Sequence, residues 1–166
     1  RVKSIYRHPV KGLTPELVEA VKLTPGRGIP NDRRFALALS STAKELASTK
    51  WVAKSNFLTL QKNERLAKLE TRFDDKTETL SVARGGHQVA RCKLTNRIGR
   101  TTIEDFFSAF FKGDALGRPK LIEASGDHIL SDCSSPVVSV LNLSSIKDLE
   151  RVTQRTVDPL RFRANI

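Results

Sequence analysis

The sequence has 166 residues, 39% of them hydrophobic, so it can fold one domain around a core, or one domain and part of a second. Its net charge of +11 indicates an anionic partner, or an acidic remainder in a longer protein. Two widely spaced cysteines exclude a disulfide framework or a zinc site and favour a cytoplasmic protein. No segment is long and apolar enough to span a membrane, and the absence of methionine indicates that the chain is part of a longer product.

The first third of the chain predicts short strands separated by turns. Three strands are expected there, covering residues 2–11, 17–23 and 34–39. The third strand is apolar on both faces, which predicts that it is buried. Residues 49–60 predict a short helix followed by a loop.

A three-stranded antiparallel meander is expected next. Its strands alternate apolar and polar residues and cover 66–73, 79–83 and 87–94. Thr101 and Glu104 then form a capping-box pattern, which predicts that a helix begins near Thr101. Four phenylalanines at helical spacing extend this helix to Gly113 and predict a face packed on the core.

The last part of the chain predicts more strands and a second short helix. The strands are expected at residues 120–124, 137–143 and 161–166. The helix is expected to begin at residues 145–148, with Ser144 or Ser145 as its N-cap. These elements predict a β-rich α+β fold, a β-barrel of short, mostly antiparallel strands with two helices.

Two short blocks place cations beside apolar, strand-like runs. Lys11 follows a Pro-containing turn and precedes Gly12, which can take a positive φ or let the backbone approach a ligand. Lys11 can meet a phosphate as a point charge, or it can be an ordinary surface lysine. Arg33 and Arg34 point to opposite faces if the strand begins there, so only one can serve a site. Arg33 lies nearer the loop and is the better anion ligand, with a simple salt bridge as the alternative.

A third block lies near the end of the chain. Arg161, Arg163 and Asn165 share one face of the expected last strand, and two like charges on one face favour an anion between them. Ser144 and Ser145 can add hydroxyl and N–H donors to the same site, or simply cap the second helix. The three blocks therefore predict a single anion pocket gathered from distant segments.

The order of these blocks resembles a known family. A strand followed by Pro-Val-Lys, then Asp-Arg-x-Phe, then Ser-Pro and Asn-x-x-Ser, and finally Arg-Phe-Arg-x-Asn is similar to the pattern of MOSC proteins. This family includes amidoxime-reducing components and the C-terminal part of molybdenum cofactor sulfurases. The resemblance implies a MOSC N-terminal β-barrel-like domain at residues 1–124. Residues 125–166 would then be the incomplete start of a MOSC domain, a second β-barrel.

The resemblance also implies a ligand, the molybdenum cofactor, whose pterin carries a phosphate tail. The residues implied for its pocket are Lys11, Gly12, Arg33, Ser144, Ser145, Arg163 and Asn165. Pyridoxal phosphate is a second possible cofactor, which is implied only by its association with the family. The intact protein is expected to reduce N-hydroxylated compounds or to carry sulfur, with redox or sulfur-donor proteins as partners.

The resemblance places the metal-ligating cysteine of the family beyond Ile166. Cys92 and Cys133 lie in other contexts and are expected to be buried or incidental thiols, so the chain alone is expected to show no molybdenum-dependent turnover. A different class of function stays open, a non-catalytic basic β-barrel that binds nucleic acid or another polyanion. Acidic segments between the cationic blocks and the scarcity of aromatic residues disfavour nucleic acid. A scaffold domain that presents partners to one another is the third alternative.

Overall fold

The computed structural model describes residues 1–40, 53–114, 117–126 and 128–166. Within these ranges the strands are β1 (Ile5–Arg7), β2 (Glu16–Val18), β3 (Phe35–Ala38), β4 (Leu69–Asp74), β5 (Thr79–Arg84), β6 (His87–Lys93) and β7 (Lys120–Glu123). The α-helices are α1 (Arg97–Phe110) and α2 (Leu143–Thr153), and short 3-10 helices cover Lys54–Asn56, Glu64–Lys68 and Pro159–Phe162. The predicted fold class is confirmed, because the described part of the chain is β-rich, with antiparallel sheets and two α-helices.

The predicted meander is the sheet β4–β5–β6. Its strands are antiparallel, with Phe73 opposite Leu80 and Leu80 opposite Cys92. These three side chains lie on one face of the sheet, because directly opposed residues of neighbouring strands project to the same side. That face packs in the main core, so all three are buried. A register shift between Val82 and Ala83 bends the sheet as it approaches the turn into β6.

Strand β3 is buried along its whole length, as its apolar pattern predicts. It pairs with β7 in an antiparallel ladder that sets Leu37 opposite Leu121. Isolated bridges add Val10 beside Phe35 and Phe57 beside Ala38. The predicted second strand is shorter than expected, since β2 ends at Val18 and pairs only with β1.

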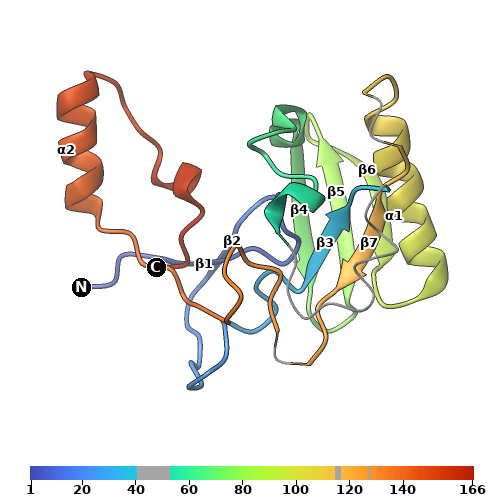
Figure 1. Cartoon of the computed structure of the whole chain (residues 1–166), viewed down its shortest axis with the longest axis horizontal. Coiled ribbons are helices and arrows are strands. Elements are labelled where there is room, and N and C mark those ends of the chain that lie inside the picture. The colour runs from blue at the N-terminus through green and yellow to red at the C-terminus, as the bar shows by residue number, and fades with distance from the viewer. Residues whose placement is uncertain (41–52, 115–116, 127) are drawn as a thin grey trace.

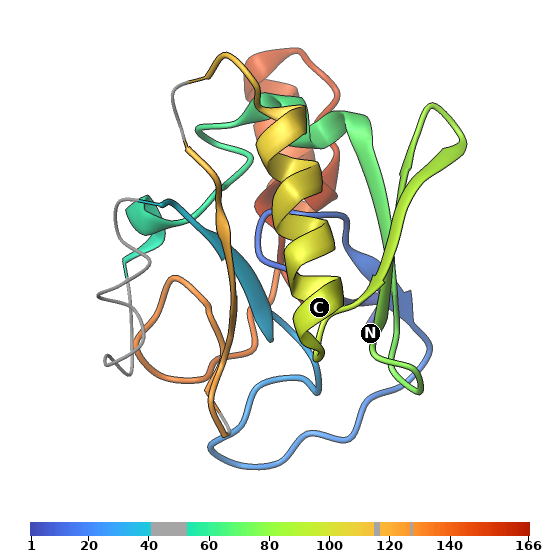
Figure 2. The ribbon, with the colours of Figure 1, turned by 90° about the vertical axis from the view of Figure 1, so that its right-hand side faces the viewer.

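Helix α1 packs on the sheets through its phenylalanine stripe. Ile103, Phe107 and Phe111 are buried in the main core, with Phe106 and Phe110 partly buried at its border. The helix lies between the meander and the β3–β7 pair (Figure 2). The predicted apolar face is therefore a core face.

The predicted start of α1 is wrong by one turn. The helix begins at Arg97, and Asn96 is its N-cap, with the side-chain oxygen of Asn96 accepting from the Gly99 N–H at 2.6 Å. The Thr101–Glu104 pattern lies inside the helix, where the Glu104 carboxylate instead accepts from the Leu121 N–H at 3.1 Å. Asparagine is as good an N-cap as threonine, and here it ends the loop from β6.

The C-terminal part differs more from the prediction. Residues 137–143 and 161–166 are not strands, although the Leu141 N–H donates to the Ile166 carbonyl at 2.7 Å and the Asn165 N–H to Ser139 at 3.0 Å. A 3-10 turn at Pro159–Phe162 and a left-handed Arg163 prevent a continuous strand. Helix α2 begins at Leu143, earlier than predicted, and Asn142 caps it instead of Ser144 or Ser145.

The arrangement of the chain is seen in Figure 1. Helix α2 lies apart from the sheets, at the opposite end of the long axis from α1. Of the predicted helix and loop at residues 49–60, residues 49–52 lie outside the described residues, and Lys54–Asn56 forms a short 3-10 turn before Phe57. In the described ranges, no helix combines the length and apolar character needed to cross a membrane.

Candidate anion pocket

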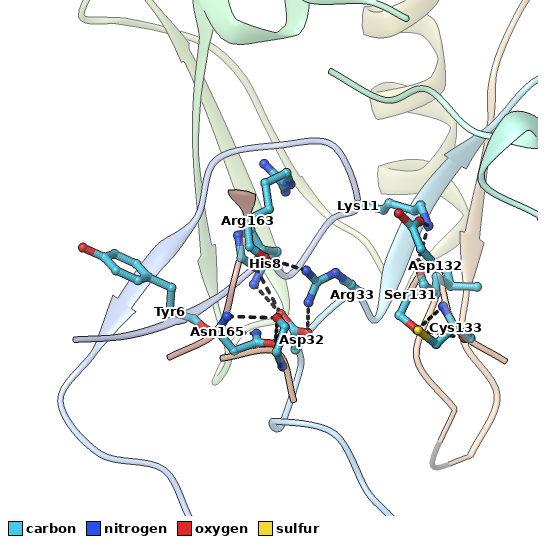
Figure 3. A network of polar contacts seen from close by, with 12 residues as sticks. Tyr6, His8, Lys11, Asp32, Arg33, Ser131, Asp132, Cys133, Arg163 and Asn165 are labelled. Carbon is cyan, nitrogen blue, oxygen red and sulfur yellow. Dashed lines mark hydrogen bonds and ion pairs between the residues drawn. The ribbon is translucent and has the colours of Figure 1, made fainter. Parts of the chain in front are cut away.

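A cavity of about 700 Å³ lies where the N-terminal turn, the start of β3 and the C-terminal segment meet. Five of the seven residues predicted for the site line it, namely Lys11, Gly12, Arg33, Arg163 and Asn165. Lys54, Asp132, Cys133 and Arg161 also reach its wall. The predicted convergence of the three cationic blocks is therefore seen in the folded chain (Figure 3).

The backbone around Gly12 positions the first cation. The Lys11 N–H donates to the Phe35 carbonyl at 2.8 Å, which fixes the turn to the start of β3. Gly12 has φ +83°, and a Cβ there would lie 2.7 Å from the carbonyl oxygen of Leu58. Glycine is needed at this position for both reasons, because an L-residue would be strained and would collide with backbone.

The Lys11 ammonium is buried but well supplied with partners. It donates to the Leu130 carbonyl at 2.9 Å and to Asp132 Oδ1 at 2.6 Å, and it lies 5.3 Å from the centre of the Phe57 ring. Burial lowers the pKa of Lys11 from its ordinary value, although Asp132 opposes this shift. Lys11 is thus a fixed charge at the cavity wall, and the surface-lysine alternative is wrong.

Arg33 and Arg34 diverge, as their adjacent positions predict. Arg33 forms an ion pair with Asp32 through Nη1 and donates through Nη2 to the Arg163 carbonyl at 2.9 Å. Arg34 instead reaches Glu78 at 2.8 Å and Glu123 at 2.7 Å, away from the cavity. Arg33 therefore makes the salt bridge given as its alternative role, and it also lines the cavity.

Asp32 lies at the centre of a small buried network, formed with His8 and Arg33, that we call the hub. Its carboxylate is fully buried, pairs with Arg33, and accepts from the His8 N–H at 2.7 Å. His8 is also fully buried, and its Nδ1 lies 3.4 Å from Asp32 Oδ1. Burial opposes ionisation of Asp32, but bonds from His8 and the Arg33 charge outweigh it and hold the pKa of Asp32 below its ordinary value. The hub supplies the fixed negative charge that lets two arginines sit close together.

Arg163 is a cavity-lining cation whose side chain has an unfilled hydrogen-bonding capacity. Burial, followed by repulsion from Arg33, lowers the pKa of Arg163 to about 10. Its Nη2 is buried and has no hydrogen-bond partner. The predicted strand face shared with Arg161 is wrong, because Arg163 has φ +52° at the end of a 3-10 turn. Arg163 nevertheless faces the cavity together with Arg33.

Asn165 ties the C-terminal segment to the N-terminal strand. Its side-chain nitrogen donates to the Tyr6 carbonyl at 3.1 Å, and its oxygen accepts from the Ser139 N–H at 3.1 Å and hydroxyl at 2.9 Å. The side-chain amide of Asn165 therefore already has hydrogen-bond partners within the chain (Figure 3). This clamp holds Arg163 beside the cavity.

Ser144 and Ser145 do not join the pocket. Ser144 lines a different cavity, of about 530 Å³, near the start of α2, and Ser145 is exposed on that helix. The Ser144 N–H donates to Asn142 at 2.9 Å, so the helix N-terminus is already capped from within the chain. The placement of these serines in the cation cavity was wrong because the helix begins earlier and lies apart from the sheets.

The two cysteines differ in exposure. Cys92 is buried in the meander, which raises the pKa of its thiol to about 11. Cys133 is exposed and lines the cation cavity, so only the burial expected for Cys92 is confirmed. Among the described residues, no group of three or more His, Cys, Asp or Glu side chains is placed to hold a metal ion.

Acid should weaken the fold through His8. Burial, and next the charges of Arg163 and Arg33, keep the pKa of His8 below 6.5 despite the nearby Asp32. The unfolded chain therefore binds a proton at His8 more readily than the folded chain does. The free energy of unfolding is highest above pH 6.5, the pKa of an unperturbed histidine, and it falls as the pH decreases toward the pKa of His8 in the folded chain. We expect the free energy of unfolding to fall by about 1 kcal/mol between pH 7.5 and 5.5, measured by urea denaturation. His8→Gln should remove this loss and the exposed control His87→Gln should keep it, whereas equal slopes in both would contradict the assignment.

The fold and the cavity define a β-rich domain with a cationic pocket assembled from three segments. A family model for the MOSC N-terminal beta barrel domain matches residues 1–119, and the chain belongs to this family. Comparison with curated proteins and with solved structures gives no significant match. The sequence resemblance is thus confirmed for the N-terminal barrel.

Proposed function

We propose that the cavity binds the phosphate of an anionic cofactor, and that the intact protein is a molybdenum cofactor-binding MOSC protein. The observation that supports this most is that Arg163, whose buried Nη2 has no hydrogen-bond partner, lines the same cavity as Lys11 and Arg33. A buried guanidinium N–H without an acceptor is costly, and a phosphate oxygen would satisfy it. Membership of the MOSC N-terminal family supports the choice of ligand.

The residues present fit the anionic part of that cofactor. Lys11, Arg33 and Arg163 offer N–H donors and positive charge, which is the donor set that a phosphate group requires. When bound, the molybdenum centre would supply redox or sulfur-transfer chemistry, such as reduction of N-hydroxylated compounds. The role of this chain is to bind and orient the ligand.

A boundary between two domains is part of the same proposal. The family match ends at residue 119, directly before β7 begins at Lys120. The chain then leaves the sheets, and residues 128–166 include α2, which lies apart from them (Figure 1). Arg161, Arg163 and Asn165, which follow α2, line the cavity. We assign this last part to the start of a MOSC domain that completes the pocket by supplying Arg163.

Arg33→Ala tests the proposal in the intact protein. We expect cofactor retention to weaken roughly ten- to hundredfold, because a charge-assisted hydrogen bond is worth about 1.5–3 kcal/mol. Arg34→Ala is the matched control, since it also removes an arginine with two acceptors, here Glu78 and Glu123, but one that points away from the cavity. Pterin and phosphate content after purification is the readout, with thermal unfolding of both variants measured alongside. Equal loss of cofactor in both variants, or none in either, would count against the pocket.

A further inference from the structure

The cation cavity already contains a carboxylate of the protein itself. Asp132 Oδ1 lies 2.6 Å from Lys11 Nζ, and Asp132 Oδ2 lies 4.0 Å from Lys54 Nζ. Both lysines and Asp132 line the cavity. The position at which Lys11 would bind a ligand anion is therefore taken by Asp132 (Figure 3).

We propose that Asp132 is an internal competitor for anions, which makes the pocket selective for dianionic phosphate over monoanions. This inference rests on the proposed function, because it assigns Asp132 a role in the same cavity. It adds a specificity determinant that no alternating pattern or motif in the sequence indicates.

The two partners of this ion pair differ in their freedom to move. The Lys11 side chain is only 7% exposed, whereas that of Asp132 is 61% exposed. Lys11 is also held by the Leu130 carbonyl. Rotation of the exposed Asp132 side chain into water can therefore open the position, while Lys11 stays in place.

The backbone beside Asp132 is held separately from its side chain. The Ser131 hydroxyl donates to the Cys133 carbonyl at 2.9 Å and accepts from the Cys133 N–H at 3.2 Å. These bonds bracket Asp132 without using its carboxylate. The exchange thus needs a rotamer change of one side chain, with the loop left as it is.

Selectivity follows from the charge of the incoming ligand. A monoanion that displaces Asp132 only replaces one carboxylate-like charge by another, and the tethered Asp132 competes at a high effective concentration. A dianionic phosphate can also bind through Arg163 and Arg33 while Asp132 stays on Lys11, so its binding does not require the displacement of Asp132. Asp132 should therefore suppress acetate binding more strongly than phosphate binding.

The test compares wild type with Asp132→Asn by titration calorimetry, using inorganic phosphate and acetate as probes. In Asp132→Asn we expect phosphate affinity to rise roughly three- to tenfold and acetate affinity to rise more, so that the preference for phosphate narrows. Asp114→Asn is the matched control, since Asp114 pairs with Arg65 at 2.9 Å and does not line the cavity. This control should bind both probes as wild type does.

Two outcomes would overturn the inference and separate it from the proposed function. Phosphate binding that depends on Arg163 but is unchanged or weaker in Asp132→Asn would reject the competitor role and leave the anion pocket in place. No phosphate binding by wild type or by Asp132→Asn would reject the anion pocket and the competitor together. Thermal unfolding of each variant checks that the fold is intact.

Discussion

Arg163→Met is expected to weaken phosphate binding about ten- to hundredfold while leaving the fold as stable as wild type, or more stable. The affinity falls because the variant removes the guanidinium of Arg163, a cavity-lining side chain whose buried Nη2 has no hydrogen-bond partner. Stability is kept because Arg163 is a desolvated cation beside Arg33, and a methionine of similar length avoids both costs. Titration calorimetry with inorganic phosphate and thermal unfolding measure the two effects.

Two further variants make this result specific to Arg163. Arg163→Lys should bind phosphate with intermediate affinity, since it keeps the charge but loses the planar fork. Arg155→Met removes an exposed arginine that does not line the cavity, and it should bind as wild type does. Unchanged phosphate affinity in Arg163→Met, or an equal affinity loss in Arg155→Met, would show that the guanidinium does not act as a ligand.

Asp32→Ala is expected to destabilise the chain by about 3–5 kcal/mol, a large fraction of the stability of a typical domain. The carboxylate is fully buried, pairs with Arg33 and accepts from the His8 N–H at 2.7 Å. Its loss leaves two arginines close together without the compensating charge. Urea denaturation followed by circular dichroism measures the change in free energy.

The control for Asp32 is an exposed acid. Asp148→Ala removes a carboxylate whose side chain is 74% exposed and which lies 3.8 Å from Arg151 on α2. Its effect should stay within about 0.5 kcal/mol. If Asp32→Ala also changed stability by less than about 1 kcal/mol, the hub would not hold the pocket together.

Much of the β-rich part could be predicted from sequence. The alternation in β4, β5 and β6 gives the meander, and the continuous apolar run of Phe35–Ala38 gives a buried strand. These patterns are local and have the period of a strand, so they survive in the folded chain. The phenylalanine stripe of α1 works in the same way, with the helical period.

Helix ends and the C-terminal segment could not be predicted in the same way. Asn96 and Asn142 compete as N-caps with nearby Thr101 and Ser144, and the choice depends on where the preceding loop ends. The sequence around Arg163 predicts a strand, but in the structure Arg163 ends the 3-10 turn that follows Asp158 and has a left-handed φ. Tertiary contacts decide these positions.

In the candidate site, too, some residues could be predicted from local sequence patterns and others depend on tertiary contacts. Lys11, Arg33 and Arg163 could be picked out because cations at the edges of apolar runs stand out in the sequence. Asp132 could not, because it meets Lys11 from 121 positions away and lies in no periodic element. The prediction that Ser144 lines the same cavity is wrong, because its position depends on the distance between α2 and the sheets, which no local pattern indicates.

The most direct test of the anion pocket is a crystal structure of the intact protein with its native small-molecule ligand. The account predicts that a phosphate oxygen of the ligand accepts from Arg163 Nη2 at about 2.7–2.9 Å, with Lys11 and Arg33 beside the same group. A ligand phosphate bound elsewhere, with Arg163 Nη2 still lacking an acceptor, would contradict it.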